Sequence, residues 1–107
     1  MTKNIKFSGL EISEKQAPLV IPEIGINHSG NLETAFKIVD SAHRAGAKII
    51  KHQTHIPEDE MSFHARKIIP GNSNRNIYDI IKESSLTEED EYKLFKYINK
   101  QKMIFLS

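Results

Sequence analysis

The sequence has no cysteine, no excess of charge of one sign, and no hydrophobic run of the length that a membrane span requires. The absence of cysteine excludes a disulfide scaffold and a cysteine nucleophile. Lysine and arginine number 15 and the acidic residues 14, so the net charge is only +1. This balance argues against a nucleic acid or a membrane as partner. We therefore expect a cytoplasmic protein in which any affinity for anions is local.

The hydrophobic pattern begins with a short alternating segment. Ile5 and Phe7, then Leu10 and Ile12, alternate on either side of a Ser8-Gly9 turn, which predicts a β-hairpin. We expect residues 1–17 to form this hairpin as a lid and residues 18–107 to form the main domain. The total length of 107 residues allows one domain at most.

The main domain alternates between strand and helix patterns. The pattern predicts a strand over residues 19–24, a helix over 31–46 and a second strand over 49–55. A long loop over residues 56–76 follows, then helical segments over 77–81 and 87–98 and a third strand over 103–106. This order requires a parallel sheet with right-handed crossovers. A complete eight-stranded barrel needs about 250 residues. We therefore expect an α/β fold in which the hairpin precedes only the first three strands of a (β/α)8 TIM-type barrel.

Polar residues stand where the first two strands of this sheet are expected to end. EIGINH occupies residues 23–28 and KHQTH occupies residues 51–55. The carboxyl ends of parallel strands are where ligands bind in β/α folds. A carboxylate, a lysine and amides at this edge indicate a site for an anionic substrate rich in hydroxyl groups.

The second of these segments sorts its side chains by face. Side chains alternate along a strand, so Lys51, Gln53 and His55 share one face while His52 and Thr54 share the other. The two histidines therefore do not converge on one metal ion. No residue of the chain is assigned as a metal ligand.

Four segments in order resemble the N-terminal portion of the sialic acid synthase family: EIGINH, KHQTH, EDEMS at residues 58–62 and IPGN at residues 69–72. The similarity runs from Pro18 to Ser107. Members of this family condense phosphoenolpyruvate with an N-acetylated hexosamine, such as N-acetylmannosamine, and release phosphate to give nonulosonic acids such as N-acetylneuraminate or legionaminate. The resemblance implies a phosphoenolpyruvate-dependent transferase that is a homodimer at full length.

The resemblance also implies roles for individual residues. Glu23 and Lys51 correspond to catalytic positions, and Lys51 also to the lysine that binds phosphoenolpyruvate. Gln53 and Asn72 correspond to contacts with the amino sugar. We add Asn27 and His28, just past the first strand, as further substrate-binding candidates.

A divalent cation, manganese or magnesium, is implied as well. In the family it polarises the sugar aldehyde, and its ligands would lie after Ser107. The resemblance therefore assigns no cofactor-binding residue to this chain.

The residues alone leave simpler interpretations open. Glu23 and Lys51 could form an internal ion pair that only fills the end of a barrel. Asn72 could be a turn residue beside Gly71, and His28 could satisfy a loop carbonyl.

The length of the chain suggests a truncated N-terminal fragment that is inactive by itself. The alternative is a catalytically inactive product that persists only as an associating half-barrel, because an open three-stranded sheet has exposed edges. A small anion-binding module is a third interpretation.

Overall fold

The computed structural model describes residues 3–107 and contains five strands and five helical segments in that range. They are, in chain order, β1 (Asn4–Phe7), β2 (Leu10–Ser13), β3 (Glu23–Gly25), α1 (Leu32–Arg44), β4 (Ile49–His52), α2 (Pro57–Glu60), η1 (Ala65–Lys67), α3 (Ile77–Glu83), α4 (Glu88–Lys100) and β5 (Ile104–Leu106). No helix among these residues is both long enough and apolar enough to cross a lipid bilayer.

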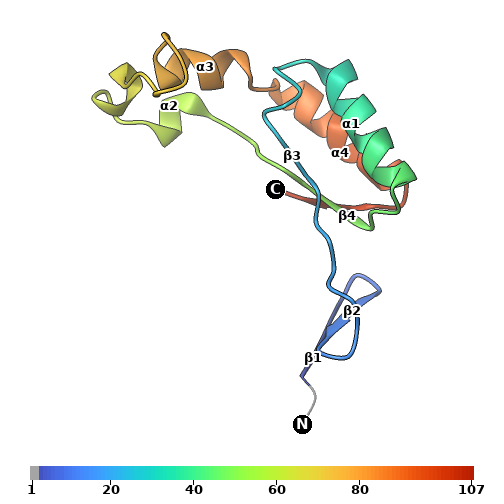
Figure 1. Cartoon of the computed structure of the whole chain (residues 1–107). Coiled ribbons are helices and arrows are strands. Elements are labelled where there is room, and N and C mark those ends of the chain that lie inside the picture. The colour runs from blue at the N-terminus through green and yellow to red at the C-terminus, as the bar shows by residue number, and fades with distance from the viewer. Residues whose placement is uncertain (1–2) are drawn as a thin grey trace.

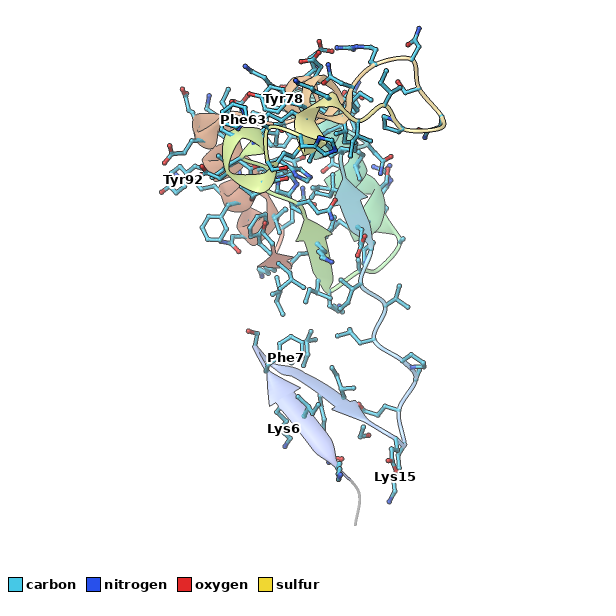
Figure 2. The ribbon with its side chains drawn as sticks, turned by 90° about the vertical axis from the view of Figure 1, so that its left-hand side faces the viewer. Lys6, Phe7, Lys15, Phe63, Tyr78 and Tyr92 are labelled. Atoms are coloured by element: carbon cyan, nitrogen blue, oxygen red, sulfur yellow. The ribbon has the colours of Figure 1, made fainter. Side chains whose placement is uncertain are left out.

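Strands β1 and β2 form the predicted hairpin. They pair in antiparallel fashion, with Ile5 opposite Ile12, and the turn residues Ser8 and Gly9 both have positive φ angles. Two positive φ angles are typical of the tight turns that match the twist of a hairpin. Figure 1 places the hairpin beyond the amino end of β3, and Figure 2 shows it apart from the remaining elements. A lid at this position would cover the amino ends of the strands and not the carboxyl ends.

The other three strands form a parallel sheet in the order β3-β4-β5. The α/β class and the parallel pairing are confirmed, but two predicted boundaries are wrong. The first strand begins only at Glu23 and not at residue 19, because Pro18 and Pro22 lack the N–H groups that a strand needs for its ladder. The second strand ends at His52, so residues 53–55 follow it as an irregular exit.

Both long helices begin at the predicted caps. The Asn31 side chain accepts a hydrogen bond of 2.9 Å from the Thr34 amide, and Thr87 caps α4 through the Asp90 amide at 3.2 Å. Past the end of α1, Gly46 has a φ angle of +90°, which glycine adopts without steric cost. The sequence therefore specifies where both helices start and how α1 ends.

The hydrophobic core lies between one face of the sheet and the helices α1 and α4 (Figure 1). Its buried members come from β3, β4, both helices and the segments before α4 and β5: Ile24, Ala35, Val39, Ile50, Leu86, Leu94, Ile98 and Met103. Because side chains alternate along a strand, Glu23 and Lys51 lie on the opposite, open face.

The long segment after β4 is folded on itself. The Arg66 guanidinium lies 4.8 Å from the Phe63 ring centroid and 5.0 Å from the Tyr78 ring centroid. Figure 2 labels Phe63 and Tyr78. The Tyr78 hydroxyl donates a hydrogen bond of 2.8 Å to Glu58 of α2. These contacts tie α2 and η1 to α3, and the expected long loop is therefore a compact unit.

Candidate active site

Glu23 and Lys51 are neighbours on adjacent parallel strands. They are register partners in β3 and β4, and the Lys51 ammonium donates a hydrogen bond of 3.2 Å to a Glu23 carboxylate oxygen. The Lys51 side chain is 40% exposed and the Glu23 side chain is 58% exposed, so the pair faces solvent on the open side of the sheet. An ion pair this exposed adds little to stability. Its cation and its carboxylate are both accessible to a substrate.

The side-chain amides of Asn27 and Gln53 both lie next to Gly25, which is two residues past Glu23 in β3. Gly25 has a φ angle of +57°, and a Cβ built there would lie 3.5 Å from the Asn27 amide nitrogen and 3.8 Å from the Gln53 amide oxygen. Both distances are ordinary van der Waals contacts, so glycine is favoured at this position by its positive φ angle and not by a lack of space. The Asn27 amide nitrogen also donates a hydrogen bond of 2.8 Å to the Ile24 carbonyl, which fixes its orientation.

His28 is buried and does not reach the open face. It is 1% exposed, and its Nδ1 accepts a hydrogen bond of 3.0 Å from the Gly30 amide. Burial lowers the pKa of His28, and nearby His52 lowers it further, against an opposing contribution from Glu91. Because the ring is buried beside His52, on the helix side of the sheet, it is not placed to contact a substrate beside Lys51.

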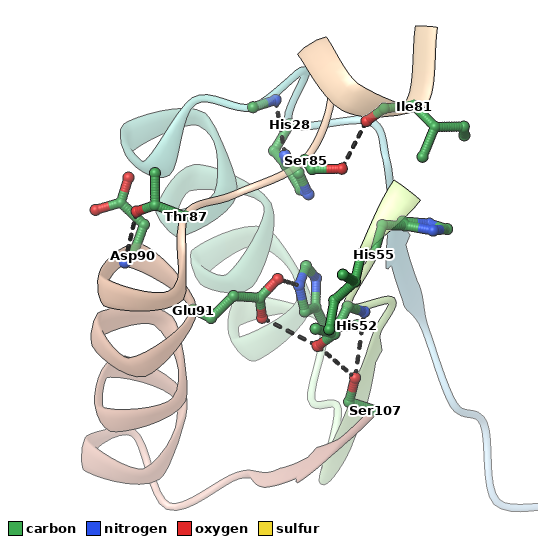
Figure 3. Close-up of polar contacts among 12 residues, drawn as sticks. His28, His52, His55, Ile81, Ser85, Thr87, Asp90, Glu91 and Ser107 are labelled. Carbon is green, nitrogen blue, oxygen red and sulfur yellow. Dashed lines mark hydrogen bonds and ion pairs between the residues drawn. The ribbon is translucent and has the colours of Figure 1, made fainter. Parts of the chain in front are cut away.

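A network that the sequence analysis missed lies behind β4. The His52 Nε2 donates a hydrogen bond of 2.8 Å to one oxygen of Glu91 in α4, and the Thr54 hydroxyl donates to the other oxygen at 3.2 Å. Because the Thr54 hydroxyl hydrogen is used in the bond to Glu91, the Thr54 oxygen accepts a hydrogen bond of 2.9 Å from the Ser107 hydroxyl (Figure 3). Glu91 thus links the exit of β4 to α4 and the end of β5.

One signal in the sequence indicates that Glu91 faces the sheet. It precedes Leu94 by three residues and Ile98 by seven, so it lies on the same buried helix stripe. An acidic residue in the first turn of a helix is also favoured by the helix dipole, so its position alone does not indicate a contact with the sheet.

The two strand-exit histidines contact different helices, but not through alternation along one strand, because His55 lies past the end of β4 at His52. His52 faces α4, whereas His55 Nδ1 pairs with Glu60 of α2 at 2.9 Å. Within residues 3–107 no group of three histidine, aspartate or glutamate side chains converges to hold a metal ion. The described residues do not fit the divalent-cation site that the resemblance implies.

Asn72 is not brought to this cluster. It is exposed on the segment between η1 and α3, which Figure 1 places beyond α2 and away from the sheet. The structure thus pairs Glu23 with Lys51, places the Asn27 and Gln53 amides beside Gly25 of the same strand, and leaves the segment of Asn72 apart from the sheet. A role for Asn72 requires this segment to move toward the strand ends.

The arrangement was compared with known proteins. A sequence model of the NeuB family matches residues 38–107, which is more than half of the chain. The chain belongs to the NeuB family. It is 29% identical to the N,N'-diacetyllegionaminic acid synthase of Legionella pneumophila over 114 aligned positions, which cover 100% of this chain and 32% of that protein.

One further relative and one solved structure are also similar to this chain. The chain is 33% identical to the pseudaminic acid synthase of Campylobacter jejuni, with 72% of this chain and 24% of that protein covered. The crystal structure of the N-acetylneuraminic acid synthetase of Leptospira borgpetersenii, in complex with citrate, superposes with a TM-score of 0.76 at 23% identity, covering 99% of this chain and 34% of that one. The latter similarity supports the α/β fold. The chain spans about a third or less of the length of these relatives.

Proposed function

We propose that this chain forms one side of the active site of a nonulosonic acid synthase. The reaction condenses phosphoenolpyruvate with N-acetylmannosamine or a related N-acetylated hexosamine and releases phosphate. The observation that carries the proposal is the exposed Glu23–Lys51 pair, joined at 3.2 Å across two neighbouring parallel strands in a NeuB-family chain.

Each residue of the cluster has chemistry that suits this reaction. The Lys51 ammonium is a compact point charge for a phosphate or carboxylate oxygen of phosphoenolpyruvate. Glu23 orients that ammonium and accepts or returns a proton during the condensation. The amides of Gln53 and Asn27 both donate and accept, as the hydroxyl and acetamido groups of an amino sugar require. Asn72 would add a sugar contact if its segment folded over the strand ends.

The proposal extends to the architecture of the whole enzyme. Strands β3, β4 and β5 are the first three strands of a (β/α)8 barrel, residues 1–17 are a separate hairpin unit, and the enzyme works as a cytoplasmic homodimer. When bound, a divalent cation supplies Lewis-acid activation of the sugar aldehyde. Since the described residues do not fit that cation, we derive no step through it.

The role of Lys51 is tested by measuring the binding of phosphoenolpyruvate to the protein with ³¹P NMR. We expect saturable shifts of the phosphate resonance, lost in Lys51→Ala and retained in Lys48→Ala. Lys48 is a suitable control because it is an exposed lysine just before the amino end of the same strand. Equal binding by both variants, or no saturable binding by the unchanged protein, would contradict the proposed role.

The reaction itself is tested by phosphate release from phosphoenolpyruvate in the presence of N-acetylmannosamine and manganese. We expect no turnover from residues 1–107 alone, because the cluster is open on one side. Turnover is expected in a longer protein that carries these residues, and Glu23→Gln should abolish it without preventing phosphoenolpyruvate binding. Turnover that survives both Glu23→Gln and Lys51→Ala would contradict the assignment.

A second candidate is a non-catalytic chain that associates through its sheet. It is favoured by the position of β5 at the edge of the three-stranded sheet, where one side of its backbone has no strand partner among residues 3–107. Sedimentation velocity distinguishes the two: concentration-dependent association without phosphoenolpyruvate binding supports this candidate, and a monomer that binds phosphoenolpyruvate contradicts it.

A further inference from the structure

Two buried histidines face each other behind the candidate site. His28 and His52 are each 1% exposed, and their ring centroids are 5.5 Å apart with an angle of 42° between the ring planes. Figure 3 shows the His28 ring directed toward that of His52. The His28 Nε2 and the His52 Nδ1 are buried, and neither has a hydrogen-bond partner among the described residues.

The hydrogen bonds on the other side of each ring determine its tautomer. The His28 Nδ1 accepts from the Gly30 amide at 3.0 Å, so the proton of the neutral ring is on Nε2. The His52 Nε2 donates to the Glu91 carboxylate at 2.8 Å, so in the neutral form of this ring the Nδ1 carries a lone pair. An unpaired donor on one ring thus stands opposite an unpaired acceptor on the other.

We propose that one buried water molecule bridges the two rings, accepting from the His28 Nε2–H and donating to the His52 Nδ1. The two ring nitrogens share no direct hydrogen bond, and a single water provides the complementary donor and acceptor. Burial and His52 together lower the pKa of His28, and the neutral ring that results is the form the bridge requires.

The bridge completes a continuous chain of hydrogen bonds from Gly30 through His28, water, His52 and Glu91 to Thr54. This chain holds the turn after β3 against the exit of β4 and against α4. Asn27 lies on that turn, and Gln53 lies between His52 and Thr54 on that exit. His28, His52 and Glu91 are therefore positioning residues for the two amides, a consequence that rests on the proposed function, whereas the water bridge itself does not.

The bridge is tested on the whole chain by NMR. At pH 7.5 we expect long-range ¹H–¹⁵N spectra to show both rings protonated at Nε2, and we expect nuclear Overhauser effects from both rings to a long-lived water. His43, which is exposed on α1, is the internal control and should show only rapidly exchanging water. Protonation at Nδ1 in either ring, the absence of the long-lived water, or ring shifts that change on adding EDTA would overturn the bridge.

The positioning role is tested with two variants of His28 in proteins shown by the same spectra to be folded. His28→Gln keeps an N–H donor near the Nε2 position, whereas His28→Phe removes it. We expect phosphoenolpyruvate affinity to be nearly unchanged in both, and amino-sugar affinity to fall about tenfold in His28→Phe and to be rescued in His28→Gln. Equal losses in both variants would overturn the positioning role.

The outcomes separate this inference from the proposed function. If no phosphoenolpyruvate binds to the unchanged protein, the proposed function fails while the ring spectra still decide the bridge. If phosphoenolpyruvate binds but the ring spectra show no shared water, the inference fails and the proposed function stands.

Discussion

The Tyr97 hydroxyl of α4 donates a hydrogen bond of 2.6 Å to the Asp40 carboxylate of α1. Gln101, one helical turn further on, donates to the same oxygen at 2.8 Å. The bond from Tyr97 and then that from Gln101 lower the pKa of Asp40. Because the Tyr97 ring also stacks on Phe36 of α1, with 4.1 Å between the centroids, this contact joins the two helices that cover the sheet.

Replacing Tyr97 by phenylalanine should lower the midpoint of urea unfolding at pH 7 while leaving the ring stack intact. A carboxyl whose pKa is lowered on folding stabilises the protein above its ordinary value of 3.8, and this contribution is lost as the pH falls through the lowered pKa. The difference between Tyr97→Phe and the unchanged protein should therefore shrink in acid. Tyr92→Phe, at an exposed position of the same helix, is the control and should have no effect.

Stability should also fall as the solution is made mildly acidic. His28 has a lowered pKa because it is buried and faces His52, with Glu91 opposing this effect and His55 adding to it. Below the ordinary value of about 6.5 the unfolded state binds more protons than the folded state, so acid favours unfolding. Urea titrations from pH 8 down to pH 5 should show this loss. The loss should be smaller in His28→Gln, and an undiminished slope in that variant would assign it to another group.

Gly30 should not tolerate a side chain. Its φ angle is +75°, and an added Cβ would overlap the carbonyl oxygen of Glu83 at the end of α3. Gly30→Ala should cost about 3 kcal/mol or more, since it combines backbone strain with a clash against backbone atoms. Gly46→Ala is the matched control, because Gly46 has a φ angle of +90° but open space around it. That change should cost about 1 kcal/mol, and equal costs would contradict the clash.

The segment between β4 and α3 should open when Arg66 is truncated. Its guanidinium contacts two aromatic rings and donates to the carbonyls of Met61 and Glu58. Hydrogen exchange of the Ile77 amide, which donates to Ile68 at 2.8 Å, reports this opening. We expect exchange about tenfold faster in Arg66→Ala. The neighbouring Lys67→Ala should leave the rate unchanged.

Removal of the Lys51 charge should scarcely affect folding. Lys51 and Glu23 are both exposed, and exposed ion pairs contribute about 1 kcal/mol or less. Lys51→Met should therefore change the free energy of unfolding by less than about 1 kcal/mol. A loss of several kcal/mol would indicate that the pair has a mainly structural role, which is the simpler interpretation of these two residues.

The helices were predictable from sequence because their ends carry local signals. Asn31, Thr87 and Gly46 each act on the backbone within a few residues, so their effect does not depend on the rest of the fold. The start of β3 was not predictable from hydrophobicity, because Leu19, Val20 and Ile21 form an apolar run whose ladder is interrupted by the flanking prolines.

The candidate site was also predictable from sequence only in part. Glu23 and Lys51 could be placed together because strand order determines which residues are neighbours. The contact between His52 and Glu91 joins residues 39 positions apart through a helix docked on the sheet, so it depends on tertiary packing. Asn72 could not be placed because its segment is held by its own contacts, those of Arg66 and Tyr78 among them.

The order β3-β4-β5 has a consequence for how the protein is made. In this sheet β4 pairs with β3 and β5 pairs with β4, so each strand after β3 joins the strand that precedes it in the sequence. The ribosome therefore delivers every new strand to an edge that is already in place, and no strand has to wait for a later partner before it can join the sheet. The sheet can grow during translation, one strand at a time and in one direction.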